Sequence, residues 1–195
     1  MNHPTRQLNF RIGLVARKHR HSFLLLRLRQ TLCLIAMLLL PAATLQAATV
    51  TAKVFSVAGT VEFAGPGSSS YAPLKKGQTL AIGSTIRTGD DGVAVLVTTP
   101  GSAIQLGNGS ILKINQLAFA KSGGAVTQRT AVLQLTSGVV SALIDPSTPK
   151  ITDFQVQTPE GAAAARGTFY AVLVYHGKTY VGVKEGKVAV KAASQ

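Results

Sequence analysis

The sequence predicts an all-β fold in a single domain, and three observations indicate it. Beyond residue 48 the apolar residues fall in stretches of four to seven, rich in Val, Ile, Leu, Phe and Tyr. Gly, Pro, Asn, Asp and Ser separate these stretches, as they do where strands reverse direction. No segment in this part keeps apolar residues at helical spacing over three turns. We therefore expect short strands arranged as a twisted β-solenoid or roll, or as a sandwich.

The first 47 residues are predicted to lie outside this domain. The stretch 1–30 carries seven Lys or Arg residues and no acid, and Thr31–Ala48 begins with an apolar run and ends in small residues. This is the pattern of a secretory signal peptide, with cleavage expected after Ala47. Because Thr31–Ala48 has 18 residues, near the lower limit for a membrane helix, an uncleaved N-terminal anchor is the alternative. In both cases residues 48–195 are exported.

The predicted strands follow one another through the exported part, and each one alternates or runs apolar. In chain order they are 54–57, 60–63, 93–97, 103–106, 111–114, 132–135, 139–144, 154–156, 169–175, 179–183 and 187–190. We expect Gly89–Gly92 to form a tight turn and His176-Gly177 to close a hairpin. The stretch Gly161–Ala165 is the best candidate for a short helix, although a bend between strands fits it equally well.

A short glycine pattern recurs four times. An apolar stretch ends, a glycine follows, and an apolar residue comes two places after it, at Gly59, Gly109, Gly138 and Gly186. Glycine adopts positive φ without a Cβ clash, which a tight strand reversal or a corner requires. The spacing between the four glycines is unequal, so they do not form a regular repeat array. We interpret the pattern as one structural unit that is used repeatedly.

Charge and cysteine content argue against several classes of protein. The chain has 20 Lys or Arg and 7 Asp or Glu, but seven of the basic residues lie before residue 48, which leaves the exported part with a net charge of +6. Its charges are scattered and lack neighbouring stacking aromatics, so we expect no nucleic-acid binding. The one cysteine, Cys33, precedes the exported part, which therefore has neither a disulfide nor a thiolate metal ligand. We expect no cofactor and no metal.

Side chains that could carry catalysis are few in the exported part. His176 is its one histidine and is expected at a solvated hairpin tip. Asp90 and Asp91 form its one acidic pair, which we interpret as a turn cap, with Ca²⁺ ligation as the alternative. No nucleophile elbow or phosphate-binding loop accompanies them. The sequence therefore favours a protein that is not an enzyme, and an enzyme acting on envelope polysaccharide is the alternative.

Two arginine motifs stand out, Arg87-Thr88-Gly89 and Arg166-Gly167-Thr168. Arg166 opens the longest apolar strand, and a buried guanidinium there would hold several carbonyls or a carboxylate with its five donors. The other interpretation of Arg166 is contact with a ligand or partner. The same two interpretations apply to Arg87, which ends a strand beside Asp90 and Asp91.

Read with their neighbours, these motifs resemble the FecR protein domain, the periplasmic β-domain of iron-dicitrate-type sensors. The matching segments are Leu74–Gly77, Ile82–Gly89, Pro100–Ser102 with Leu106-Gly107, Leu135–Gly138, Phe154–Pro159, Arg166–Phe169 and Val183–Val188, the last of which includes Glu185 and Gly186. Pro100 departs from the family, which usually has Asp there. The resemblance covers roughly residues 51–190. It implies an all-β domain that resembles a twisted solenoid, acts by protein contact and has no catalytic residues.

The resemblance implies the fold of the domain rather than complete sigma-factor signalling. The stretch before the apolar run is too short for the family's cytoplasmic anti-sigma segment, and Gln195 comes before any C-terminal transporter-contacting module. We expect a stand-alone, periplasmic or secreted module that binds envelope proteins. A free β-edge at Val181–Val190 would accept a partner strand through main-chain hydrogen bonds. The alternative is a membrane-tethered sensor or regulator, which would meet the membrane only through an uncleaved N-terminal segment.

Overall fold

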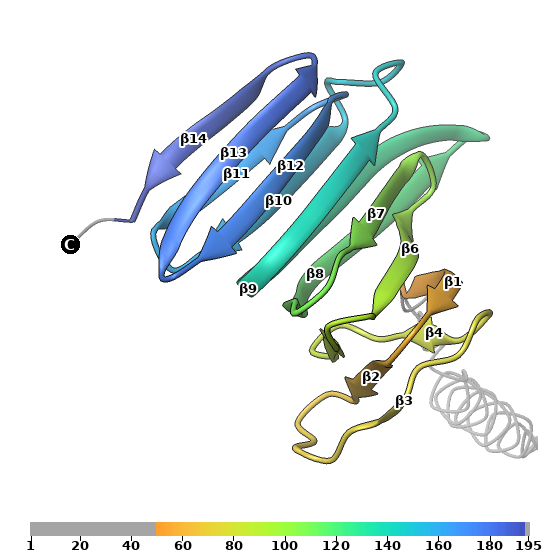
Figure 1. Ribbon diagram of the computed structural model, residues 1–195. Helices are drawn as coiled ribbons and strands as arrows, with labels where there is room; N and C mark the ends of the chain where they lie inside the picture. Colours follow the sequence, from red (N-terminus) through yellow and green to blue (C-terminus); the bar gives the residue numbers. More distant parts are fainter. Residues whose placement is uncertain (1–49, 194–195) are drawn as a thin grey trace, which may run out of the picture. The chain divides into compact units, whose positions relative to one another are not determined.

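The computed structural model describes residues 50–193, and these form fourteen strands and no helix (Figure 1). The all-β prediction is confirmed. In chain order the strands are β1 (Ala52–Ala58), β2 (Val61–Ala64), β3 (Ala72–Pro73), β4 (Thr79–Leu80), β5 (Thr85–Thr88), β6 (Val93–Thr99), β7 (Ser102–Leu106), β8 (Ile111–Ser122), β9 (Ala125–Ile144), β10 (Thr152–Thr158), β11 (Gly161–Ala165), β12 (Phe169–Tyr175), β13 (Lys178–Glu185) and β14 (Val188–Ala192).

The predicted signal peptide or anchor lies outside the described residues. Within residues 50–193 there is no helix of the length and hydropathy that crossing a membrane requires. Residues 50–193 belong to a single compact unit.

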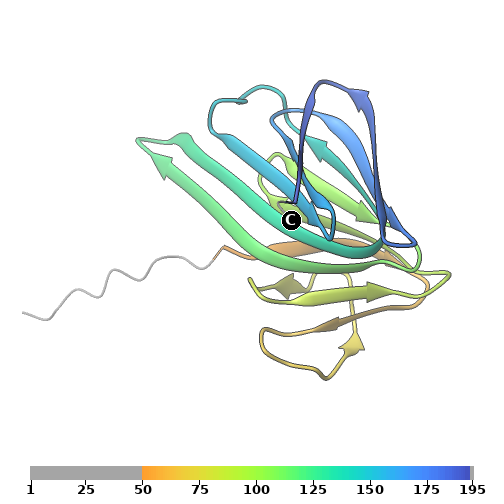
Figure 2. The same cartoon turned by 90° about the vertical axis from the view of Figure 1, so that its left-hand side faces the viewer.

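The strands are arranged in two layers that share β9. Layer A has the order β4-β1-β6-β7-β9-β12-β13, and layer B has the order β3-β2-β5-β8-β9-β10-β11-β14. The first part of β9 pairs with β8 and β10 in layer B, and its last part, from Gly138, pairs with β7 and β12 in layer A. Neighbouring strands are antiparallel, except that β10 runs parallel to β9. Figure 2 shows the long β8–β9 hairpin extending beyond the other strands.

The recurring glycine pattern marks places where the chain passes from one layer to the other. Gly59 lies between β1 and β2, Gly109 between β7 and β8, Gly138 inside β9, and Gly186 between β13 and β14. Their φ angles are +65°, +59°, +81° and +90°, in the region that favours glycine. The interpretation of the pattern as a corner that is used repeatedly is therefore confirmed.

Two predictions about local structure are wrong. Gly138 does not end a strand, because β9 bends there and continues through Ile144, so the two predicted strands on either side of it are one. Gly161–Ala165 forms neither a helix nor a bend. It is strand β11, which lies between β10 and β14 and pairs with both, so its backbone hydrogen bonds come from tertiary neighbours.

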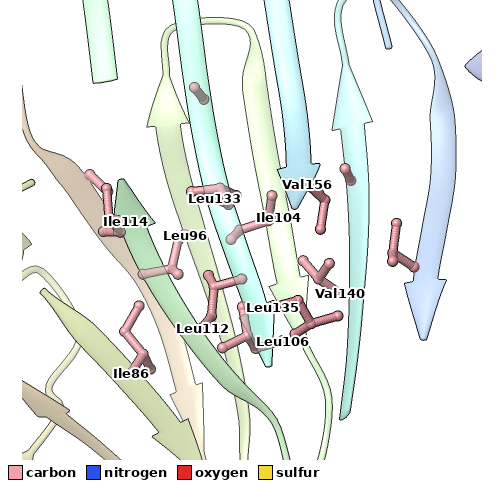
Figure 3. Close-up of a cluster of buried hydrophobic side chains, with 14 of the residues drawn as sticks. Ile86, Leu96, Ile104, Leu106, Leu112, Ile114, Leu133, Leu135, Val140 and Val156 are labelled. Carbon is pink, nitrogen blue, oxygen red and sulfur yellow. The ribbon is translucent and has the colours of Figure 1, made fainter. Parts of the chain in front are cut away.

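The inner faces of the two layers make one apolar core. Figure 3 shows Leu96, Ile104 and Leu106 of layer A close to side chains from layer B. The layer B residues labelled there are Ile86, Leu112, Ile114, Leu133, Leu135 and Val156. Each fully buried Leu or Ile contributes about 1.5–3 kcal/mol relative to an exposed one. The rings of Phe154 and Tyr170 meet edge to face, with centroids 6.5 Å apart, and so connect the layers.

Candidate functional site

The motif Arg87-Thr88-Gly89 lies at the corner where the chain leaves β5 for layer A. The Thr88 side chain is buried, and its Oγ1 donates to the carbonyl of Gly107 at 2.6 Å and accepts the N–H of Ser110 at 2.8 Å. The Ser110 hydroxyl in turn accepts the N–H of Val139 at 2.9 Å and donates to its carbonyl at 3.1 Å. Buried hydroxyls therefore join three neighbouring corners, and Thr88 stabilises the fold.

The motif Arg166-Gly167-Thr168 forms the corner between β11 and β12 and lies against the corner at Gly186. Thr168 is buried and donates its hydroxyl to the carbonyl of Lys187 at 3.0 Å. A Cβ at Gly186 would lie 2.9 Å from the Thr168 hydroxyl and 3.0 Å from the carbonyl oxygen of Gly167. These two corners approach so closely that only glycine fits at position 186. Three of the predicted motif residues therefore have a structural role, namely Thr88, Thr168 and Gly186.

The acidic pair lies in the corner between β5 and β6. The Asp91 carboxylate accepts the backbone N–H of Thr60 at 3.1 Å, and this hydrogen bond lowers the pKa of Asp91. Gly89 donates its N–H to the Thr60 carbonyl at 2.8 Å. The carbonyl of Asp90 accepts the side-chain amide of Asn108 at 2.7 Å. The prediction of a turn cap is confirmed for Asp91. Residues 50–193 contain no group of three His, Cys, Asp or Glu side chains that could hold a metal ion.

The three arginines of the described part differ in their partners. Arg87 is exposed, with its Nε 2.7 Å from a Glu62 carboxylate oxygen and its guanidinium 3.9 Å from the centre of the Tyr71 ring. Arg129 lies 3.4 Å from the carboxylate of Asp145. Arg166 has no hydrogen-bonding or ion-pair partner among residues 50–193. A buried clamp is the wrong interpretation for both motif arginines, Arg87 and Arg166.

The exposure of Arg166 has a simple geometric cause. Ala165, the last residue of β11, is buried in the core, and alternation along a strand turns the next side chain outward. Arg166 and Lys187 then line a cleft of about 720 Å³ together with Asp153 and Gln155. The cleft offers two cations and one carboxylate to a polar or anionic group. Its lining contains no histidine or cysteine that could act as a base or nucleophile.

At the C-terminal end of the domain both layers finish in strands that pair on one side only within the described residues. β13 pairs with β12, and β14 pairs with β11 (Figure 1). Val183 and Val190 are 47% and 65% exposed, although their cross-strand partners, Tyr170 and Ala163, are buried. Cross-strand partners share a face of the sheet, so these valines point toward the core and are uncovered at its end. We call β13 and β14 with these valines the open end. The free edge expected at Val181–Val190 is confirmed.

The opposite end of the domain is covered. The short strands β3 and β4 and the loop between them bring Leu74 and Leu80 over the core, where they are 5% and 1% exposed. Pro73 lies in β3, the edge strand, where proline opposes further strand pairing. The two ends of the domain therefore differ, because one is closed by its own chain and the other exposes core residues.

The open end is partly organised by Glu160. Its carboxylate accepts the backbone N–H of Thr179, and the Thr179 hydroxyl lies 2.9 Å from that of Thr158. The Thr179 N–H therefore points away from β12, and by the alternation of an antiparallel ladder so do the N–H and C=O groups of Val181 and Val183. These groups form the unpaired edge of β13. A cavity of about 200 Å³ lies between this edge and β14, lined by residues that include Val181 and Val190.

Other predicted residues lie at or near this end. Glu185 is exposed at the last position of β13, where its neighbour Lys184 lies 5.0 Å from the centre of the Phe169 ring. His176 forms the tip of the β12–β13 hairpin with a φ of +50°, as expected for a solvated turn residue.

Burial raises the pKa of Tyr170, whose hydroxyl has no hydrogen-bond partner among the described residues.

Sequence reasoning missed Ser110 and Thr60 as partners in the corner network. Thr60 takes part through its backbone N–H and C=O, which its side chain does not indicate. For Ser110 a signal was present, because it follows the Gly107–Gly109 turn. Small hydroxyl residues next to glycine turns often bond to backbone groups.

This two-layer, all-β fold with paired glycine corners defines a class of domain, and comparison with known proteins places the chain in it. The model of the FecR protein family matches residues 84–189, just over half of the 195-residue chain. The chain belongs to the FecR family. FecR domains are part of signal-transduction regulators of the cell envelope, and this chain carries such a domain.

One solved structure is similar to the chain at a low level. It is described as an anti-sigma factor from Parabacteroides distasonis ATCC 8503 and is 17% identical, with a TM-score of 0.42. The match covers 57% of this chain and 48% of that one, so the chain spans about half the length of that structure. No curated protein matches the chain.

Proposed function

We propose that this protein is an exported component of the bacterial cell envelope that binds another envelope protein and has no catalytic activity of its own. The observation that carries the proposal is the open end, where inward-facing Val183 and Val190 are exposed beside two unpaired strand edges. Exposing apolar core side chains to water at one end is unfavourable for the isolated domain, and at the other end the chain covers its core. A bound partner strand would satisfy the free backbone groups and cover the valines.

The FecR family and the leader pattern support the location. FecR domains are typically periplasmic, and the basic stretch 1–30 followed by an apolar run is typical of an export signal. The chemistry of the described residues supports a binding role. Asp91 is engaged in a corner, His176 lies at an exposed hairpin tip, and neither is joined by a second group that would complete an acid–base pair.

The experiment places a photo-crosslinking amino acid at Val183 and, as a control, at Lys113, an exposed residue of β8 on the outside of layer B. In cells that export the protein we expect adducts at Val183 and not at Lys113. Adducts of equal yield at both positions, or none at Val183, would contradict the proposal.

A second pair of variants tests whether binding occurs by strand addition. Val183→Pro removes the outward N–H and is tolerated because that N–H has no partner in β12. Val183→Ala shortens the side chain but keeps the N–H. If strand addition is correct, Val183→Pro abolishes partner capture by a crosslinker at Val190 and Val183→Ala only reduces it. Far-UV circular dichroism and thermal unfolding of each variant confirm that the fold is kept.

A membrane-tethered regulator of FecR-type signalling is the second candidate, and the leader carries it. Thr31–Ala48 is long enough to anchor the chain if it is not cleaved. Mass spectrometry of the exported protein separates the two, because an N-terminus near Ala48 excludes the anchor and an intact leader supports it. Turnover of envelope glycan by the purified protein would instead favour the enzyme alternative.

A further inference from the structure

We propose that the partner at the open end is a second copy of the same domain, joined by a twofold axis that makes both layers continuous. This inference rests on the proposed function, because it names the occupant of the same strand edges. It follows from the geometry of β13 and β14, from the pattern of their side chains and from the covered state of the opposite end.

The geometry of an antiparallel sheet limits how two copies of β13 can pair. The twofold axis must stand perpendicular to the sheet, so residues on one face pair with residues on the same face. The axes that pair the longest part of β13 pass through Gly182 or through Val181. An axis at Val181 brings Lys178 near Lys184 of the other copy, and like charges facing each other across two strands destabilise a sheet.

An axis at Gly182 gives a favourable set of pairs. Val181 then lies opposite Val183, and Lys184, at the bulge of β13 between Val183 and Glu185, comes near Tyr180, where an ammonium can contact an aromatic ring. Val181 and Val183 are residues whose N–H and C=O groups point outward, so this register also pairs the free backbone groups. An axis at Val181 would pair these groups as well, so the charges of the lysines decide between the two axes.

The same axis serves the second layer. Gly182 comes four residues before the corner at Gly186 and Val190 comes four residues after it, and the cavity between the layers is lined by both Val181 and Val190. An axis through Gly182 therefore passes near Val190, which would meet its own copy and place Lys191 opposite Ala189. The exposed valines of two open ends would then pack on one another and join the two cores.

The opposite end explains why such an assembly stops at two copies. Leu74 and Leu80 cover the core there, and Pro73 occupies the edge strand. A head-to-tail contact between an open end and a covered end would leave the valines without apolar partners. An isologous contact between two open ends buries the open end of each copy and closes.

A disulfide test uses the absence of cysteine from residues 48–195. Gly182 is exposed and a Cβ added there meets nothing within 4 Å, so Gly182→Cys is compatible with the fold. Its backbone groups point toward β12, which makes the pair across the axis a non-hydrogen-bonded one, with Cα atoms about 4.5 Å apart and within disulfide range. Gly65→Cys is the matched control, because a Cβ there also meets nothing and residue 65 lies at the covered end.

We expect Gly182→Cys to form a disulfide-linked dimer at least about tenfold faster than Gly65→Cys at equal concentration, because association brings the thiols together. Equal rates for the two variants would overturn the inference. Faster dimerisation of Val181→Cys than of Gly182→Cys would overturn the register.

Sedimentation equilibrium of residues 48–195 without substitutions measures the association directly. We expect a monomer–dimer equilibrium that Val183→Pro weakens at least about tenfold. A domain that stays monomeric while a crosslinker at Val183 captures a different protein would overturn the second-copy inference and keep the proposed function. A domain that dimerises equally with and without Val183→Pro would overturn the second-copy inference alone, and a monomeric domain that gives no adduct at Val183 would overturn both.

Discussion

Replacing Thr88 by valine tests whether the motif threonine stabilises the fold through its hydroxyl. Valine has nearly the same volume, so no cavity forms, but the hydrogen bonds to the Gly107 carbonyl and the Ser110 N–H are lost. Ser110 is 0% exposed, so its N–H would be buried without a partner. Such a group costs about 1–3 kcal/mol, and we expect Thr88→Val to lower the free energy of unfolding by about 2.5 kcal/mol.

Urea unfolding of residues 48–195, followed by far-UV circular dichroism, measures this loss. For a domain of this size the same loss lowers Tm by about 8 °C. Thr88→Ser keeps the hydroxyl and should recover most of the stability. Thr85→Val, the same substitution in the same strand, removes a hydroxyl for which the structure shows no hydrogen bond and should change stability by less than about 0.5 kcal/mol. Equal effects of Thr88→Val and Thr85→Val would refute the role assigned to the motif.

Three further predictions concern the corners and the surface charges. Gly138→Ala should destabilise by at least about 2 kcal/mol in urea unfolding, because φ is +81° there, whereas Gly65→Ala should be neutral. Glu62→Gln, which removes the exposed ion pair with Arg87, should cost less than about 1 kcal/mol in the same assay. The pKa of Asp91 is lowered in the folded state, so its stabilisation is present above its unfolded pKa, near 3.8, and is lost as pH falls below it. A series of Tm measurements from about pH 6 to pH 2 should therefore fall less steeply for Asp91→Asn than for the unmodified domain.

The parts of the fold that the sequence predicts are those in which local signals agree. The stretch 169–175 is a continuous apolar run followed by His176-Gly177, so both the strand and its two-residue turn can be read directly. The glycine corners were recognisable because positive φ leaves a chemical signature in the sequence. The sequence did not show which layer the chain enters after each corner, because that depends on which layer has an unpaired strand edge for the next strand.

Elements that depend on tertiary neighbours were not predictable in the same way. β11 consists of one glycine and four alanines, and alanine favours helix, yet two flanking strands supply its backbone partners. β5 is a strand because it lies between β2 and β8. The Arg166 side chain was expected in the interior on the basis of its five donors, but the outward turn after Ala165 decides its position. Burial of a single side chain is set by register, which a motif alone does not contain.

The residues that identify the family and the residues proposed to bind a partner are largely different sets. Thr88, Thr168 and Gly186 lie in corners, where substitution destabilises the domain and so weakens binding only as a secondary effect. Val183 and Val190 lie at the open end, where their exposure means that substitution removes little packing. A substitution in a binding surface should therefore weaken partner binding and leave the free energy of unfolding unchanged, whereas a substitution in a corner should lower both. We expect that behaviour at the open end, to which one layer contributes β13 and the other contributes β14.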